Sequence, residues 1–206
     1  MSSQFKAVIY DCDGVMFDSF EANFAFYQLI MGHMGHSLDR SDHETMRVLH
    51  TYANREVLAH FFPEPDQCQE AIRFAGSLDY RELIPMMVME EEFVPTLELL
   101  QDRVQLAVCT NRSTSMDAVL TNFGLSHYFG CVMTACQVTN PKPHPEPLNR
   151  VLAHYGLAPT EALFVGDSDV DRQAAAAAGV PFVAYKADLP AFARIDRHGE
   201  IVSLLG

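Results

Sequence analysis

The sequence is poor in basic residues, and it has no long apolar run. Its 206 residues include 14 lysines and arginines against 27 aspartates and glutamates, which gives a formal net charge of −13 at pH 7. Nucleic acids and anionic membrane surfaces are bound through clustered Lys and Arg, so neither is an expected partner. No apolar run approaches the roughly 18 residues of a membrane-spanning helix. A small anionic ligand stays compatible with the net charge, because a bound divalent cation can dominate the field of a site.

Cysteine is also scarce, and its number and spacing argue against two common roles. The five cysteines are Cys12, Cys68, Cys109, Cys131 and Cys136. An odd count does not suit a framework of disulfides, and the spacing fits no zinc pattern. No secretory signal precedes the first apolar run at residues 5–10. We therefore expect reduced thiols in a cytoplasmic protein.

What the sequence does contain is typical of a folded α/β protein. Hydrophobic residues make up 49% of the chain and charged residues 20%, and its length suits one domain, or one domain with a smaller insertion. Short apolar runs alternate with helical patterns, which predicts βαβ units and a parallel sheet. The predicted strands are Phe5–Tyr10, Val104–Thr110, Val132–Thr134, Ala162–Gly166 and Phe182–Tyr185.

The long segment after the first predicted strand reads differently. Residues 18–88 carry no comparable strand signal, and their pattern predicts four helices. These helices are Phe20–Met31, Ser41–Ala53, Asn54–Phe61 and Asp66–Tyr80. We interpret residues 18–88 as a helical cap that is inserted into a core made of residues 1–17 and 89–206.

The most informative motif is a pair of carboxylates at the end of a buried strand. Asp11 and Asp13 follow the apolar run of residues 5–10, and Gly14 lets the backbone turn tightly beside them. Carboxylates in such a place repel each other unless a cation or a shared proton relieves them. The pair therefore predicts a metal site, a chemical task, or both.

Polar residues follow two further strands, and a lysine lies in a stiff loop between them. Thr110 and Asn111 precede a helix N-terminus, where backbone N–H groups favour anions, although such residues are also ordinary helix caps. Asp167 and Asp171 follow the strand that ends at residue 166. Lys142 stands between two prolines, which either fixes its ammonium in place or simply makes a rigid polar loop.

The order of the strands decides whether these residues meet. Ligands of open α/β sheets bind at the carboxyl ends of the strands, so the polar residues would converge at one edge if their strands are neighbours. The carboxylates of Asp11, Asp13 and Asp167 would be unfavourable there without compensation. A hard cation with oxygen ligands provides it, and Mg²⁺ is bound in this way. The sequence therefore predicts a Mg²⁺ site.

In their order and spacing, the motifs resemble those of the haloacid dehalogenase superfamily of aspartyl-phosphate hydrolases. The four matching motifs are Asp11-x-Asp13-Gly14-Val15, Thr110, Lys142 and Gly166-Asp167-Ser168-x-x-Asp171. The similarity covers nearly the whole chain, and the Lys-Pro-x-Pro run and the alanine-rich helix resemble phosphoglycolate phosphatase-like members. The resemblance implies an α/β fold, a Rossmann-like parallel sheet core with helices on both faces, and an inserted all-helical cap.

The resemblance also implies a division of catalytic work. Asp11 would be the nucleophile that attacks phosphorus and forms an aspartyl-phosphate. Asp13 would be the general acid and base, which protonates the departing alkoxide and then activates water. A dehalogenase expels halide, which needs no proton, whereas a phosphomonoester expels an alkoxide, which does. Asp13 therefore favours phosphoryl chemistry.

The remaining motif residues would bind the metal and the phosphoryl group. The implied ligands of Mg²⁺ are Asp11, the backbone carbonyl of Asp13, and Asp167. Asp171 would support these ligands without contacting the ion. Thr110, the backbone around Asn111, and Lys142 would hold the phosphoryl oxygens. Lys142 would also help to keep the nucleophile ionised.

The predicted function is a magnesium-dependent phosphatase of a small phosphomonoester, such as phosphoglycolate or a sugar phosphate. The expected partner is a small phosphorylated metabolite, and the expected protein is a monomer or a homodimer. One alternative is a phosphomutase of the β-phosphoglucomutase kind, which shares all the motifs. Another is a catalytically idle binding or regulatory protein of the same fold.

Basic residues of the cap and of the loop after Thr110 are weaker candidates. Arg47, His50 and Arg55 in the cap either face the substrate or lie on the surface. Arg112 either helps to hold the leaving group or points to solvent. The sequence leaves both choices open.

Overall fold

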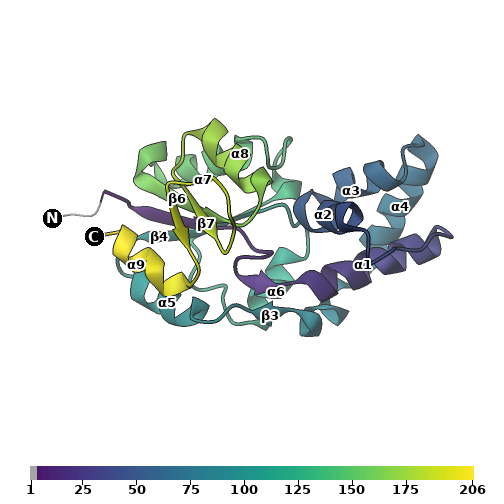
Figure 1. Cartoon of the computed structure of the whole chain (residues 1–206), viewed down its shortest axis with the longest axis horizontal. Coiled ribbons are helices and arrows are strands. Elements are labelled where there is room, and N and C mark those ends of the chain that lie inside the picture. The colour runs from purple at the N-terminus through teal and green to yellow at the C-terminus, as the bar shows by residue number, and fades with distance from the viewer. Residues whose placement is uncertain (1–3) are drawn as a thin grey trace.

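A computed structural model of the chain describes residues 4–206. Its core is a sheet of six parallel strands in the order β5-β4-β1-β6-β7-β8 (Figure 1). The strands are β1 (Ala7–Tyr10), β4 (Gln105–Thr110), β5 (Cys131–Thr134), β6 (Ala162–Gly166), β7 (Phe182–Tyr185) and β8 (Ala193–Ile195). The prediction of a parallel sheet is confirmed, and five of its strands lie where the sequence predicted them.

Strand β1 sets the register of the strands that carry the predicted site. Tyr10 pairs with Val108 of β4 on one side and with Val165 of β6 on the other. The three strands run in the same direction, so the residues that follow them emerge at one edge of the sheet. Asp11 and Asp167 are therefore brought to the same place by strand pairing.

Alternate residues of the strands face two separate hydrophobic layers. Val8 and Val108 belong to one layer, and Ile9 and Ala107 belong to the other. The helices of the first layer are α5 (Phe93–Leu100), α6 (Met116–Asn122) and α9 (Ile201–Leu204), and those of the second are α7 (Glu146–Tyr155) and α8 (Asp169–Ala178). The sheet is thus covered by helices on both faces, as predicted (Figure 1).

The layer under α8 consists largely of small side chains. Its alanines are Ala7, Ala107, Ala162 and Ala184 from the strands and Ala174, Ala175 and Ala178 from the helix. Small side chains on both surfaces let a helix approach a sheet closely, and alanine also has the highest helix propensity. The run of five alanines serves both purposes and ends at Gly179, whose φ of +71° suits a helix C-terminus.

Four helices at one end of the molecule form the cap (Figure 1). They are α1 (Phe20–His33), α2 (His43–Thr51), α3 (Asn54–Phe61) and α4 (Pro65–Ser77). The buried side chains of the cap form a hydrophobic cluster distinct from those of the core. They include Ile30 of α1, Leu49 of α2 and Phe62, which directly follows α3. The predicted all-helical insertion is confirmed, with ends that differ from the predicted ones by up to three residues.

The chain crosses between core and cap at two adjacent places. Strand β2 (Phe17–Asp18) pairs antiparallel with β3 (Val88–Met89), so the outgoing and returning segments lie side by side. The predicted boundaries at residues 17/18 and 88/89 fall in this pair. The division of the chain into domains at those residues stays a prediction.

Several short elements complete the structure. The 3₁₀ helices are η1 (Tyr80–Glu82), η2 (Ile84–Met86), η3 (Ala135–Gln137), η4 (Pro159–Glu161) and η5 (His198–Glu200). Strands β2, β3 and β8 were not predicted, because two or three residues are too few to show an alternating pattern. Within residues 4–206, no helix has the length and apolar character needed to cross a membrane.

A buried histidine in η5 holds the loop that follows β1. The Nε2–H of His198 donates a hydrogen bond of 2.8 Å to the carbonyl of Val15, and its ring stacks on Tyr185 with centroids 4.4 Å apart. Its Nδ1 atom is buried and has no hydrogen-bond partner in the described part of the chain. Burial lowers the pKa of His198 to about 4, so this histidine is neutral at pH 7.

We expect His198 to make the fold less stable in mild acid. Its pKa is about 4 in the folded state and near 6.5 when unfolded, so the unfolded chain takes up a proton first as the pH falls. The contribution of the neutral, buried imidazole to the free energy of unfolding is fully present above pH 6.5 and is lost as the pH falls towards 4. At about pH 5 the loss is about 2 kcal/mol. Urea unfolding at about pH 7.5 and about pH 5 should show this extra loss in the wild type relative to His198→Phe. Equal pH dependence of the two proteins would contradict the expectation.

Candidate active site

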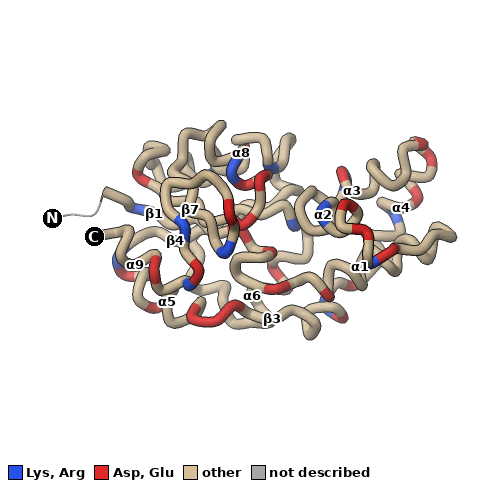
Figure 2. The backbone as a smooth tube through the Cα atoms, viewed as in Figure 1, with Lys and Arg blue, Asp and Glu red and all other residues tan. Residues whose placement is uncertain are grey.

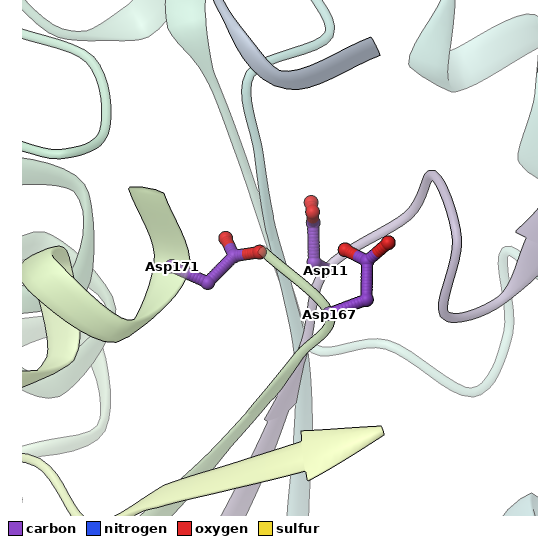
Figure 3. A group of neighbouring side chains, drawn as sticks. All are labelled: Asp11, Asp167 and Asp171. Carbon is purple, nitrogen blue, oxygen red and sulfur yellow. The ribbon is translucent and has the colours of Figure 1, made fainter. Parts of the chain in front are cut away.

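Three aspartates meet at the carboxyl edge of the sheet. Asp11 follows β1, Asp167 follows β6, and Asp171 lies in the first turn of α8. One side-chain oxygen of each lies within 4.8 Å of those of the others. Figure 3 shows Asp11 and Asp167 side by side at the strand ends, with the carboxylate of Asp171 reaching towards them from the helix. Within residues 4–206, no other group of His, Cys, Asp and Glu side chains has this geometry.

A buried lysine contacts two of these aspartates. The Nζ of Lys142 donates a hydrogen bond of 2.6 Å to Oδ1 of Asp171 and lies 2.9 Å from Oδ1 of Asp11. Asn111 holds the lysine backbone through two reciprocal bonds, because its Oδ1 accepts from the Lys142 N–H at 3.1 Å and its Nδ2 donates to the Lys142 carbonyl at 3.0 Å. The stiff loop and this amide together fix the position of the ammonium.

The electrostatics of the cluster are dominated by burial and by repulsion between carboxylates. Burial, and next the charge of Asp171, raise the pKa of Asp11 to about 7 although Lys142 opposes them. Burial, and next the charges of Asp171 and Asp11, raise the pKa of Asp167 well above its usual range. Burial alone would lower the pKa of Lys142, but the charges of Asp11 and Asp171 outweigh it and raise that pKa. One ammonium leaves excess negative charge, which a cation would relieve.

The oxygen atoms of the cluster suit a hard divalent cation. Oδ1 of Asp11 is buried and contacts the ammonium of Lys142 at 2.9 Å, while no described residue donates a hydrogen bond to Oδ2 of Asp11 or to the carboxylate of Asp167. Both oxygens of Asp171 already accept hydrogen bonds from the protein. Oδ1 accepts from Lys142, and Oδ2 accepts from the hydroxyl and the N–H of Ser168 at 2.5 and 3.2 Å. Asp11 and Asp167 are thus free to bind an ion that prefers oxygen ligands, and Asp171 is placed to support them.

Gly14 lets the loop after β1 pass close to Asp167. Its φ is +74°, a conformation that side chains rarely adopt. A Cβ at this position would lie 2.0 Å from Oδ2 of Asp167. Any other residue at position 14 would therefore displace one of the free carboxylates.

The side chain of Asp13 belongs to a different network, which joins the core to the cap. Its Oδ1 accepts hydrogen bonds from Nη2 and Nε of Arg112 at 2.6 and 3.1 Å, and also from Ser19 and Asn23. The hydroxyl of Tyr80 accepts from Arg112 at 2.9 Å and donates to Asn23 at 2.8 Å. Arg112 follows β4, whereas Asn23 is in α1 and Tyr80 is in η1.

This network determines the charge of Asp13. Burial alone would raise the pKa of Asp13, but the guanidinium of Arg112 and the hydrogen bonds from Ser19 and Asn23 outweigh it and lower the pKa below its usual range. Arg112 is buried, so the alternative in which it points to solvent is wrong. No periodic pattern in the sequence points to Ser19 or Asn23, and the position of Arg112 directly after Thr110 and Asn111 is the one hint of the network.

A cavity of about 360 Å³ lies between the core and the cap. The predicted residues Asp11, Asp13, Thr110 and Asn111 line it, and Lys142 is packed behind Asp11. The side chain of Thr110 is buried, and its hydroxyl accepts from the N–H of Arg112 at 3.1 Å. Four predicted residues therefore line one cavity, and Lys142, Asp167 and Asp171 lie next to it around Asp11, while the role of each stays a prediction.

The three basic candidates of the cap are placed differently. His50 lines the cavity. Arg47 is exposed and bonds to Glu44 at 2.6 and 2.9 Å, and Arg55 is exposed as well. Neither arginine is among the residues that line the cavity in the described chain. Figure 2 shows the acidic residues spread over core and cap alike, with a run of them next to β3.

The family model for haloacid dehalogenase-like hydrolases matches residues 8–185, a span that includes every residue of this site. The chain belongs to this family. A HAD-superfamily hydrolase of subfamily IA, variant 1, from Geobacter sulfurreducens PCA has a solved structure that is 66% identical over the full length of both chains, with a TM-score of 0.79. The resemblance inferred from the four motifs is thus confirmed.

More distant relatives share the family but differ in their named activities. The phosphoglycolate phosphatase of Salmonella paratyphi A is 44% identical over 81 residues, which are 39% of this chain and 32% of that protein. The chain thus spans about a third of the length of that relative in the match. Pyrophosphatase PpaX of Bacillus pumilus is 29% identical over 86% of this chain and 81% of its own. The β-phosphoglucomutase of Clostridium difficile shares the fold, at 18% identity over 96% of this chain and 93% of that chain with a TM-score of 0.80.

Replacing Lys142 with methionine should destabilise the protein strongly. The change leaves Asp11 and Asp171 buried without their shared partner, and breaking a buried ion pair in this way costs about 3–5 kcal/mol. Urea unfolding near pH 8 measures the loss. Lys186→Met is the matched control, because Lys186 is about half exposed and its pair with Glu90 is worth less than about 1 kcal/mol. Similar losses in the two variants would show that the cluster is not a buried ion pair in solution.

Proposed function

We propose that the protein is a magnesium-dependent phosphatase that hydrolyses a small phosphomonoester through an aspartyl-phosphate on Asp11. The observation that carries this proposal is the place of the Asp11 carboxylate. It lines the cavity, its Oδ1 lies 2.9 Å from a fixed ammonium, and its other oxygen accepts no hydrogen bond from the described residues. A carboxylate held in this way can approach a phosphorus atom that enters from the cavity.

Asp11, the backbone carbonyl of Asp13, and Asp167 would hold the ion. When bound, Mg²⁺ supplies positive charge that screens the repulsion between the nucleophile and the phosphoryl oxygens. Lys142 adds a fixed charge on the same side, and Asp171 keeps its ammonium pointed there. These charges would also keep Asp11 ionised against the effect of burial on its pKa.

Asp13 would move the proton. It lines the same cavity as Asp11, two residues further along the loop. Because its pair with Arg112 keeps Asp13 ionised, it would have to take up a proton before it gives one to the alkoxide that leaves phosphorus. Once ionised again, it would take a proton from the water that attacks the aspartyl-phosphate. Thr110 and the backbone around Asn111 would bind the phosphoryl oxygens through their N–H and O–H groups.

Asp11→Asn should abolish phosphate release, by at least about a thousandfold, because the amide cannot form the acyl-phosphate bond. The measurement is inorganic phosphate released from a panel of phosphorylated metabolites at saturating Mg²⁺. Circular dichroism and urea unfolding should show an intact fold. Substantial residual hydrolysis would refute nucleophilic catalysis by Asp11, and interconversion of glucose phosphates without release would point to a mutase.

Asp167→Asn should weaken Mg²⁺ binding by at least about tenfold, because it removes a free carboxylate from the ligand set. Calorimetric titration with MgCl₂ measures this independently of activity. Asp169→Asn is the matched control, since Asp169 is two residues away, exposed, and paired with Arg172 at 2.6 Å. Chelation should stop phosphate release by the wild type and Mg²⁺ should restore it; hydrolysis that persists without metal would rule out the proposed site.

A further inference from the structure

The cavity has a charged side and an apolar side. Its charged side chains, Asp11, Asp13 and Arg112, all come from the core. The cap contributes a surface of aromatic and aliphatic side chains, which are Phe26, Tyr27, Leu49, Tyr52, Ile72 and Leu78. A phosphoryl group bound beside Asp11 would leave its ester group extending towards this cap surface. The cap surface therefore faces whatever alcohol is released.

The cap offers no cation to that alcohol. The three lysines of the chain, Lys6, Lys142 and Lys186, all lie outside residues 18–88. None of the five arginines of residues 18–88 lines the cavity. Arg47 and Arg55 are exposed, and Arg40, Arg73 and Arg81 pair with Glu21, Glu70 and Asp79. A negatively charged group on the alcohol would thus find no counter-charge on the cap side of the described structure.

Arg112 is the one cation that lines the cavity in the described chain, and its nitrogens are already used. Nε donates to Asp13, Nη2 donates to Asp13, Tyr80 and Asn23, and Nη1 donates to Ser115 at 3.4 Å. The side chain is 5% exposed. A carboxylate or second phosphate could take the Nε and Nη2 edge of this guanidinium only by displacing Asp13, which leaves Nη1, held by one long bond to Ser115, as the position still open to it.

The remaining polar groups on the cap side are uncharged. Burial lowers the pKa of His50, so its imidazole is neutral at pH 7, and its buried Nε2 has no hydrogen-bond partner within residues 4–206. Thr51 and Asn54 lie beside it in the cavity lining. These groups suit a hydroxyl or another neutral polar group rather than an anion.

We propose that this phosphatase releases an uncharged alcohol with an apolar or aromatic face, and that phosphomonoesters with a second anionic group, phosphoglycolate included, are poor substrates. This inference rests on the proposed function. The apolar face would gain binding energy by covering the aromatic and aliphatic cap surface. A second anion would lose its water for no more than the single Nη1 atom of Arg112, or would break the pair between Arg112 and Asp13.

The test compares pairs of substrates that differ in charge but have alcohols of similar reactivity. Benzyl phosphate is compared with 4-carboxybenzyl phosphate, and 2-hydroxyethyl phosphate with phosphoglycolate, by phosphate release at saturating Mg²⁺. We expect kcat/KM to be at least about tenfold higher for the neutral member of each pair, and higher for benzyl than for 2-hydroxyethyl phosphate. Ratios near one, or a preference for the carboxylates, would overturn the inference and show that Arg112 releases Asp13 to bind the substrate.

A variant adds the missing charge. Leu78→Lys places an ammonium on the apolar side of the cavity and should shift the benzyl to 4-carboxybenzyl ratio towards the acid by at least about tenfold. Leu29→Lys, at a half-exposed position of α1 that does not line the cavity, should leave the ratio unchanged. If Leu78→Lys fails to fold, as judged by urea unfolding, the wild-type ratios still decide. Hydrolysis of none of the four esters by a protein that releases phosphate from the metabolite panel, or hydrolysis that favours the acids, overturns this inference alone. Absence of release from the four esters and from the panel overturns the proposed function itself.

Discussion

The site depends on one ammonium group that is buried among carboxylates. Lys142 lies 2.6 Å from Asp171 and 2.9 Å from Asp11, and the three side chains are 2%, 1% and 11% exposed. Charges buried to this degree must be paired, so a loop, a helix and a strand end have to deliver their side chains to one point. The parallel register of β1, β4 and β6 and the two bonds of Asn111 to the lysine backbone accomplish this.

The same cluster explains why the edge of the sheet suits a cation. One ammonium cannot balance the three carboxylates of the cluster, and the excess negative charge lies on Asp11 and on Asp167, which accepts no hydrogen bond from the described residues. Burial, and next this repulsion, raise the pKa of both groups. An ion that binds the folded chain at this point relieves the repulsion and so stabilises the fold by mass action. Metal binding and folding are coupled at this edge because they act on the same charges.

The parts of this arrangement that could be predicted are those that follow strands. An apolar run with a polar residue directly after it locates a strand end, and a parallel sheet brings such ends together, which is how the sequence predicted that Asp11 and Asp167 would meet. The network of Arg112 with Asn23 and Tyr80 could not be predicted in this way. It depends on how the cap helices pack over the core, and no periodicity links Arg112 to Tyr80, 32 positions away in the sequence. Contacts between separately packed units leave no local signal.

Core and cap contribute different physical properties to the cavity. The core supplies charges that strand register fixes in place, and the cap supplies apolar surface and uncharged polar groups. Arg112 lies where the two meet, and its bonds to Asn23 and Tyr80 depend on the cap. A leaving group that captured Arg112 would remove the cationic partner of Asp13, a carboxylate in which burial already disfavours charge. Selectivity between neutral and anionic leaving groups would then depend mainly on the cost of breaking the pair between Arg112 and Asp13. The contacts that a substrate adds in the cavity would matter less.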